Sequence, residues 1–160
     1  ELGIPRGSKM FFRGICLLCC CSKKNIESKC QVLKSFGWTE DQVSNMMTKN
    51  TAAFLLSEAN IMKKLTFLMN ELGYDPGFLA THPALFTYSL EKRLLPRYRV
   101  LLVLKEKGLL DYKFYTATLI TETKFLKTFV EPFKEDVPGL LEIYQTSEPN
   151  VEPLSTVIPN

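Results

Sequence analysis

An all-α fold built from helical repeats is predicted by the spacing of four glycines along this 160-residue chain. Gly3, Gly37, Gly73 and Gly108 follow one another at intervals of 34, 36 and 35 residues, each at the end of an apolar run. A second apolar stretch follows each glycine after a short polar turn, and no alternating β-branched run is long enough for a strand. Such a period is typical of stacked helix-turn-helix units, each too small to bury its own apolar face. We therefore expect a solenoid of about four units of ~35 residues.

Helix start signals place the first units. Thr39 followed by Gln42 forms the pattern of a capping box directly after the Gly37 turn, so a helix is expected to begin there. Ser57 can cap a second helix, whose apolar stripe recurs at helical spacing and ends at Gly73.

The following units are marked by proline as well as by caps. Asp75 is a candidate N-cap with a proline directly after it, and Pro83 ends the short helix that begins there. The next helix is expected to run from near Ser89 to Gly108, with Pro96 tolerated only near its start.

Helix signals are weaker after Gly108. Asp111 is expected to cap a helix, a further helix covers about 125–130, and another follows Pro138. From residue 147 onward no periodicity is present. The predicted organisation is a partial repeat array over residues 1–146 and a disordered tail over 147–160.

Charge is distributed unevenly along the chain. Residues 1–130 carry 19 Lys and Arg against 11 Asp and Glu, whereas residues 131–160 carry one Lys against six acidic residues. A basic body with a short acidic tail suits a polyanionic partner. The alternative is a scattered, solvated lysine surface without a specific partner.

The chain begins with Glu rather than Met and starts inside a repeat, so we interpret it as a fragment, or a truncated product, of a longer array. Any targeting peptide would then lie upstream. Residues 10–21 are apolar but too few to span a bilayer, so no membrane association is expected. The chain is expected to be a monomer.

Neither catalysis nor a cofactor is expected. His82 is the only histidine, and no glycine-rich phosphate-binding motif is present. Cys16 and Cys19 have the spacing of a zinc motif, but no second such pair exists, and adjacent cysteines on a helix point in different directions. We expect these thiols to be reduced and free of metal, and we do not expect an enzyme.

Basic residues near the starts of the long helices are the candidate binding site. Repeated at the same place in each unit, they would form a charged stripe along one edge of the solenoid, and such a stripe can follow the phosphates of a nucleic acid. The predicted nucleic-acid-binding residues are Lys63, Lys64, Lys92, Arg93, Arg97 and Arg99.

Three segments resemble the repeat motif of plant members of the mitochondrial transcription termination factor (mTERF) family. They are LGYDPGFLATHPALFTYSLEKRLLPR at residues 72–97, LKSFGWTEDQ at 33–42, and LGIPRGS at 2–8. The resemblance covers about residues 2–146. His82 stands where arginine is common in the motif, and the cysteines at 19–21 replace small polar residues.

This resemblance implies a helical solenoid with a positively charged groove that binds organellar DNA or RNA, typically duplex DNA. It implies regulation of transcription termination or initiation, or RNA processing, in the mitochondrion or the chloroplast.

Two other interpretations keep the ~35-residue period. A pentatricopeptide- or tetratricopeptide-like array would bind single-stranded RNA or peptides, although the internal prolines and the lack of a recurring pair of base-reading positions disfavour it. A HEAT-like array would serve as a protein-interaction scaffold without any nucleic acid.

Overall fold

The computed structural model describes residues 22–146, and all regular secondary structure in this part of the chain is helical, without a strand. It divides into two compact units, one within Glu1–Tyr88 and one within Ser89–Asn160, and each is described by itself. The prediction of an all-α fold is therefore confirmed. The cysteines at 16–21, Gly3 and the predicted tail lie outside the described residues.

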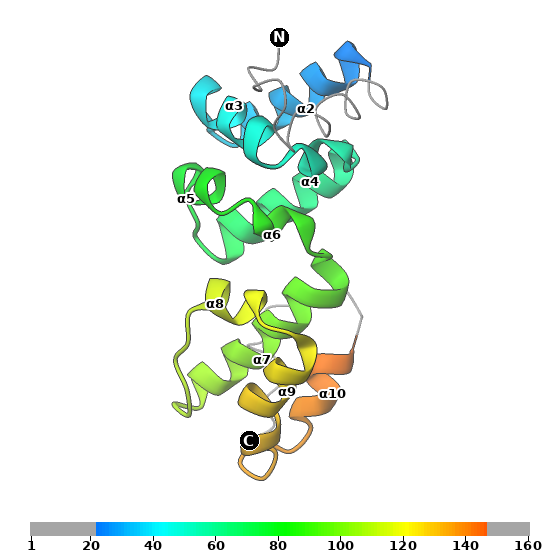
Figure 1. Cartoon of the computed structure of the whole chain (residues 1–160). Helices are drawn as coiled ribbons and strands as arrows, with labels where there is room; N and C mark the ends of the chain where they lie inside the picture. Colours follow the sequence, from blue (N-terminus) through cyan, green and yellow to red (C-terminus); the bar gives the residue numbers. More distant parts are fainter. Residues whose placement is uncertain (1–21, 147–160) are drawn as a thin grey trace. The chain divides into compact units, whose positions relative to one another are not determined.

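The first unit contains two successive repeats (Figure 1). Its elements are α2 (Lys23–Ser35), α3 (Glu40–Lys49), η1 (Thr51–Leu55), α4 (Glu58–Leu65), η2 (Thr66–Glu71), α5 (Pro76–Thr81) and α6 (Ala84–Thr87). Equivalent elements of the two repeats pack on each other: α2 against α4, α3 against α5, and η1 against α6. Within this unit, the helices therefore stack repeat on repeat.

The predicted caps of the first unit are present. Thr39 accepts from the Gln42 backbone N–H at 3.3 Å, and the Gln42 side chain accepts from Thr39 N–H at 2.9 Å, which completes the capping box. Ser57 caps α4, and Asp75 caps α5. These side chains satisfy backbone N–H groups that have no partner within their own helices.

The glycine turns are also confirmed. Gly37 and Gly73 have φ values of 83° and 66°, and Gly108 in the second unit has 67°. This left-handed conformation is strained for residues with a Cβ, which explains why glycine recurs after each long helix.

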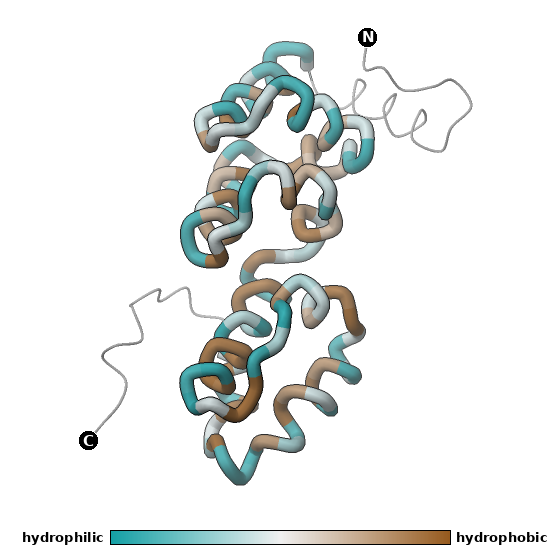
Figure 2. The backbone as a smooth tube through the Cα atoms, turned by 90° about the vertical axis from the view of Figure 1, so that its left-hand side faces the viewer, coloured by the Kyte–Doolittle hydropathy of each residue, from teal (hydrophilic) through white to brown (hydrophobic). Residues whose placement is uncertain are grey.

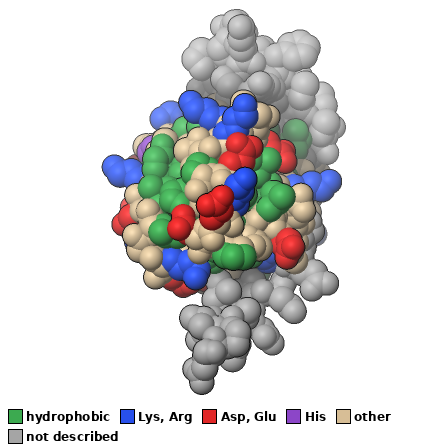
Figure 3. Space-filling model, turned by 90° about the horizontal axis from the view of Figure 1, so that it is seen from below, with side chains coloured by type: hydrophobic (Ala, Val, Ile, Leu, Met, Phe, Trp, Pro, Cys, Tyr) green, Lys and Arg blue, Asp and Glu red, His purple; other side chains and the backbone are tan. Residues whose placement is uncertain are grey.

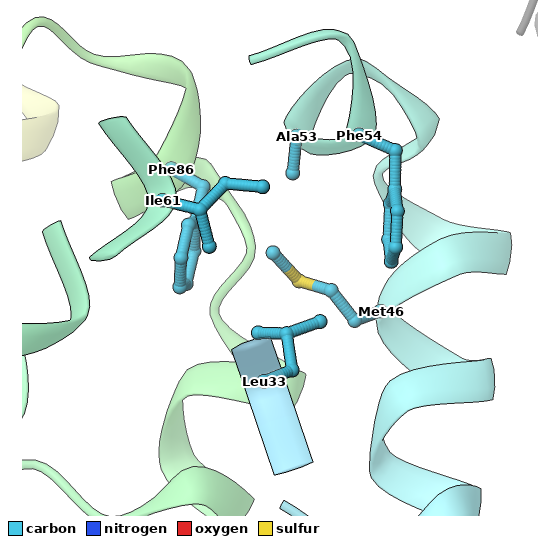
Figure 4. A pocket seen from close by; sticks show the side chains of 6 residues that line it. All are labelled: Leu33, Met46, Ala53, Phe54, Ile61 and Phe86. Carbon is cyan, nitrogen blue, oxygen red and sulfur yellow. The ribbon is translucent and has the colours of Figure 1, made fainter. Parts of the chain in front are cut away.

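The core of the first unit is mainly apolar. In Figure 2 hydrophobic and hydrophilic residues alternate within single helical turns, as expected of helices with one buried face. A small apolar cavity shows how the elements converge (Figure 4). Its lining comes from α2, α3, η1, α4 and α6: Leu33, Met46, Ala53, Phe54, Ile61 and Phe86.

The second unit begins with one long helix, made of the π-helical segment η3 (Leu90–Leu94) and α7 (Leu95–Glu106). Pro96 lies in the first turn of α7, as expected. The other elements are α8 (Phe114–Leu119), α9 (Glu122–Phe129), η4 (Glu131–Phe133) and α10 (Leu140–Gln145). Both α8 and α10 pack against α7.

One predicted cap is wrong. The helix after Gly108 begins at Phe114, and its N-cap position is Lys113, without a side-chain cap. Asp111 lies in the irregular segment before it, with its Oδ1 3.4 Å from the Lys105 ammonium nitrogen. The aspartate is too far upstream to reach the first N–H groups of α8.

Candidate nucleic-acid interface

The six predicted binding residues lie on long helices of both units. Lys63 and Lys64 are in α4 of the first unit, Lys92 and Arg93 are in η3, and Arg97 and Arg99 are in α7. They differ sharply in exposure, which separates them into two groups.

Arg97 is buried and bound to backbone. Its side chain is 1% exposed, and its Nη1 donates to the carbonyl oxygens of Ala117, Thr118 and Ile120 at 2.7, 3.3 and 2.8 Å. Its Cζ also lies 4.7 Å from the centre of the Phe125 ring, in cation–π geometry. Burial lowers the pKa of Arg97, but an arginine remains charged at neutral pH.

Arg93 binds the same carbonyls from one helical turn away. Its Nε and Nη2 donate to Thr118 O at 3.1 and 2.9 Å, and Nη2 also donates to Ile120 O at 2.8 Å. The side chain is half-buried. The proximity of this second guanidinium is a further cause of the lowered pKa of Arg97.

Lys64 in the first unit is also buried and donates to backbone carbonyls, as Arg97 does in the second unit. It is 5% exposed, and its Nζ donates to the carbonyls of Phe86 and Tyr88, both at 2.6 Å. These carbonyls lie at the C-terminal end of α6, where a helix leaves its last C=O groups without internal partners. The partial negative charge there favours a cation.

Lys29, which the sequence interpretation missed, is a third such cation. It is 4% exposed and donates to Phe54 O at 2.7 Å, in the last turn of η1. Lys29, Lys64 and Arg97 thus bind the ends of the short elements η1, α6 and α8, respectively. In each case the bound carbonyls lie one to four residues before the Ser or Thr that caps the next long helix. The recurrence of basic residues along the chain partly reflects this buried role.

A signal for these buried cations is present in the sequence. Each stands between two apolar residues, three positions after the first and four before the second, so all three side chains share one helical face. The sets, all buried, are Ile26–Lys29–Leu33, Ile61–Lys64–Leu68 and Leu94–Arg97–Leu101.

The π-helical segment η3 keeps Arg97 on this face. Lys29 and Lys64 each stand seven residues after their N-caps, Ser22 and Ser57, but Arg97 stands eight after Ser89. A π turn accommodates one extra residue, and the Leu94 N–H bonds five residues back to Ser89 O at 3.1 Å. The insertion is therefore absorbed before the buried cation is reached.

The remaining predicted residues are accessible. Lys63 and Lys92 are exposed, and Arg99 is half-buried, with its Nη1 2.9 Å from Thr146 O. Exposed ammonium and guanidinium groups can bind phosphate without any catalytic step. Lys64 and Arg97, in contrast, present no surface to a phosphate in this structure. Phosphate contact by the exposed and half-buried residues stays a prediction.

Not every face of the molecule is suited to a polyanion. On the face shown in Figure 3, Lys and Arg side chains are interspersed with Asp and Glu. A phosphate backbone is favoured by a surface of one sign. The candidate interface is therefore defined by particular helices rather than by the whole surface.

His82 lies in an aromatic stack. Its ring is 4.0 Å from that of Phe78, which is 4.5 Å from that of Tyr74, and its Nδ1 lies 2.9 Å from Phe78 O. Within residues 22–146 no group of His, Cys, Asp or Glu could hold a metal ion. Over the same range, no helix has the length and apolar character needed to cross a membrane.

Comparison with known proteins connects this geometry to a family. Residues 11–126 match the family model described as mTERF. Over 112 residues the chain is 28% identical to "Transcription termination factor MTERF15, mitochondrial" of Arabidopsis thaliana, which covers 69% of this chain and 25% of that protein. The chain thus spans about a quarter of this relative's length. No solved structure matches significantly. Because the family model covers more than half of the chain, the chain belongs to the mTERF family.

Proposed function

We propose that this chain is part of an organellar nucleic-acid-binding protein that acts in transcription, with duplex DNA as its ligand. The family membership is the observation that carries the proposal. The name of the Arabidopsis relative, a mitochondrial transcription termination factor, supports both transcription and the mitochondrion over the chloroplast. Binding, rather than an enzymatic step, is the proposed activity.

In this proposal the basic residues have two separate tasks. Lys63 and Lys92 are exposed and contact phosphates, together with the part-exposed Arg93 and Arg99. Such contacts hold the sugar-phosphate backbone and contribute affinity without reading sequence. Lys64 and Arg97 hold helix ends inside the protein.

Equilibrium binding across a salt series tests the proposal. Labelled duplex DNA, single-stranded DNA and RNA of the same sequence are titrated with the 160-residue chain, and fluorescence anisotropy is measured. We expect the tightest binding on duplex DNA, with an affinity that falls steeply with salt because each phosphate contact releases counterions. Tighter binding to single-stranded RNA would favour the pentatricopeptide-like alternative. Absence of salt-dependent binding to all three would favour a protein scaffold.

Single neutralising variants identify the contacts. Lys63→Gln and Lys92→Gln should each flatten the log–log salt slope on duplex DNA by about 0.9. Lys134→Gln is the matched control, because Lys134 is exposed but lies beside Glu135 and Asp136, which repel phosphate. An equal change in slope for the control would show that only net charge is being measured.

A further inference from the structure

Buried cations bind backbone carbonyls shortly before the start of the next long helix. In the second unit Arg97 binds Thr118 O and Ile120 O, and the next residue, Thr121, caps α9 through its hydroxyl, 3.3 Å from Lys124 N. In the first unit Lys29 binds Phe54 O, three residues before the cap of α4.

Arg97 holds α9 by its buried face as well. The guanidinium lies over the Phe125 ring, and that ring stacks on Tyr144 of α10 with ring centres 5.4 Å apart. Tyr144 also interacts favourably with the Arg97 guanidinium, which opposes the lowering of the Arg97 pKa by burial. One side chain of α7 thus contacts the end of α8, the core face of α9 and a residue of α10.

The opposite face of α9 carries two cations. Lys124 and Lys127 are exposed and three residues apart, so they lie on neighbouring positions of one helix surface, whereas Phe125 and Phe129 are buried. The direction in which the two ammonium groups project is set by the rotation of α9. That rotation depends on the Thr121 cap and on the Phe125 ring. Arg97 lies over the Phe125 ring and binds the carbonyl of Ile120, the residue before Thr121.

We propose that Arg97 is a positioning residue for a phosphate-binding pair, Lys124 and Lys127, on α9. Lys29 has the same relation to Lys63 on α4. The buried cations contact no phosphate, and they determine where the exposed cations of the following helix are held. This inference rests on the proposed function, because it requires that the chain bind nucleic acid.

A double-mutant cycle in duplex DNA affinity tests the proposal. The variants of the full chain are Arg97→Lys, the pair Lys124→Gln with Lys127→Gln, and all three changes together. Arg97→Lys keeps the charge but loses the planar fork that binds several carbonyls. We expect the lysine pair to flatten the log–log salt slope by about 1.8. Arg97→Lys should weaken binding in the wild-type background and cause no further loss once the pair is neutralised.

The outcomes separate a positioning role from a general structural one. An equal fold-loss from Arg97→Lys in both backgrounds would overturn the proposal, as would a lysine pair whose removal leaves affinity and slope unchanged. In the Lys134→Gln background, Arg97→Lys should cost the same factor as in wild type. If wild type binds no nucleic acid, the proposed function itself fails.

A second variant keeps the test valid if Arg97→Lys does not fold, which circular dichroism would show. Phe125→Leu removes the ring below the guanidinium and leaves the Arg97 bonds to the carbonyls in place. It should again weaken duplex binding only while Lys124 and Lys127 are present. An effect of Phe125→Leu that persists without the two lysines would overturn the proposal.

Discussion

Replacing Arg97 by Met removes a buried charge while keeping most of the side-chain volume. The wild-type guanidinium makes three hydrogen bonds to carbonyls of the segment at the end of α8 and one cation–π contact with Phe125. Methionine can fill the space but cannot donate a hydrogen bond. We expect Arg97→Met to destabilise the second unit.

The expected loss in the free energy of unfolding depends on which carbonyls lose their hydrogen-bond donor. Thr118 O and Ile120 O keep their bonds to Arg93, so the main loss is the bond to Ala117 O and the contact with the ring. A hydrogen bond to a charged group contributes about 1.5–3 kcal/mol, and a desolvated cation–π contact about 2 kcal/mol. Part of this gain is offset by the cost of burying the guanidinium, whose Nε has no hydrogen-bond partner among the described residues. The net expected loss is about 2–4 kcal/mol.

Urea unfolding followed by far-UV circular dichroism measures this loss. Lys92→Met is the control, because Lys92 is exposed on the same long helix and its replacement should change the free energy of unfolding by less than about 0.5 kcal/mol. Arg93→Met should give an intermediate value, since water can reach the half-buried site. An Arg97→Met variant as stable as Lys92→Met would refute the assignment of Arg97 to the core.

Three further outcomes are expected. Leu68→Ala, at a side chain that is 0% exposed, should cost about 2–5 kcal/mol in urea unfolding, and a loss near zero would show that its helix face is misassigned. Gly73→Ala should cost about 1–2 kcal/mol through its φ of 66° alone, because no atom beyond the adjoining residues lies within 4 Å of an added Cβ. Gly73→Asn should cost less, and the reverse order would argue against backbone strain. Burial raises the pKa of the Cys30 thiol above its ordinary value of 9.0, so its contribution to stability is present below that pH and is lost as the pH rises through the raised pKa. Iodoacetamide should therefore label Cys30 more slowly at pH 8 in the folded chain than in urea, as read by mass spectrometry, and equal rates would contradict this.

The starts of α3, α4 and α5 were predictable because they depend on local chemistry, whereas α9 begins at Glu122, three residues before the expected start. The Thr39–Gln42 capping box and the Asp75 cap each use side chains within three residues of the N–H groups that they satisfy. The glycine turns depend on a single residue's φ. Asp111 failed as a cap because the helix begins only at Phe114, three residues further on, which no local pattern indicates.

The buried cations were harder to predict because their partners are distant in sequence. Arg97 binds carbonyls 20 to 23 residues away, and Lys29 binds one 25 residues away. A lysine or arginine near a helix start is usually solvated, so the exposed assignment was the natural one. Only the repeated position of each cation between two buried apolar residues distinguishes it from Lys63 or Lys92.

A comparison of the adjacent residues Lys63 and Lys64 tests most directly our claim that exposed basic residues bind nucleic acid and buried ones stabilise the fold. Lys64 holds two carbonyls of the first unit, including that of Phe86, whose ring packs edge-on against the chain's single tryptophan, Trp38. The measurement is the free energy of unfolding of Lys63→Met and Lys64→Met, read by Trp38 fluorescence. Lys64→Met should lose about 3–5 kcal/mol, because one buried and one part-buried carbonyl lose a charged donor. Lys63→Met should stay within about 0.5 kcal/mol of wild type. Equal losses in the two variants, or an unchanged Lys64→Met, would contradict the account.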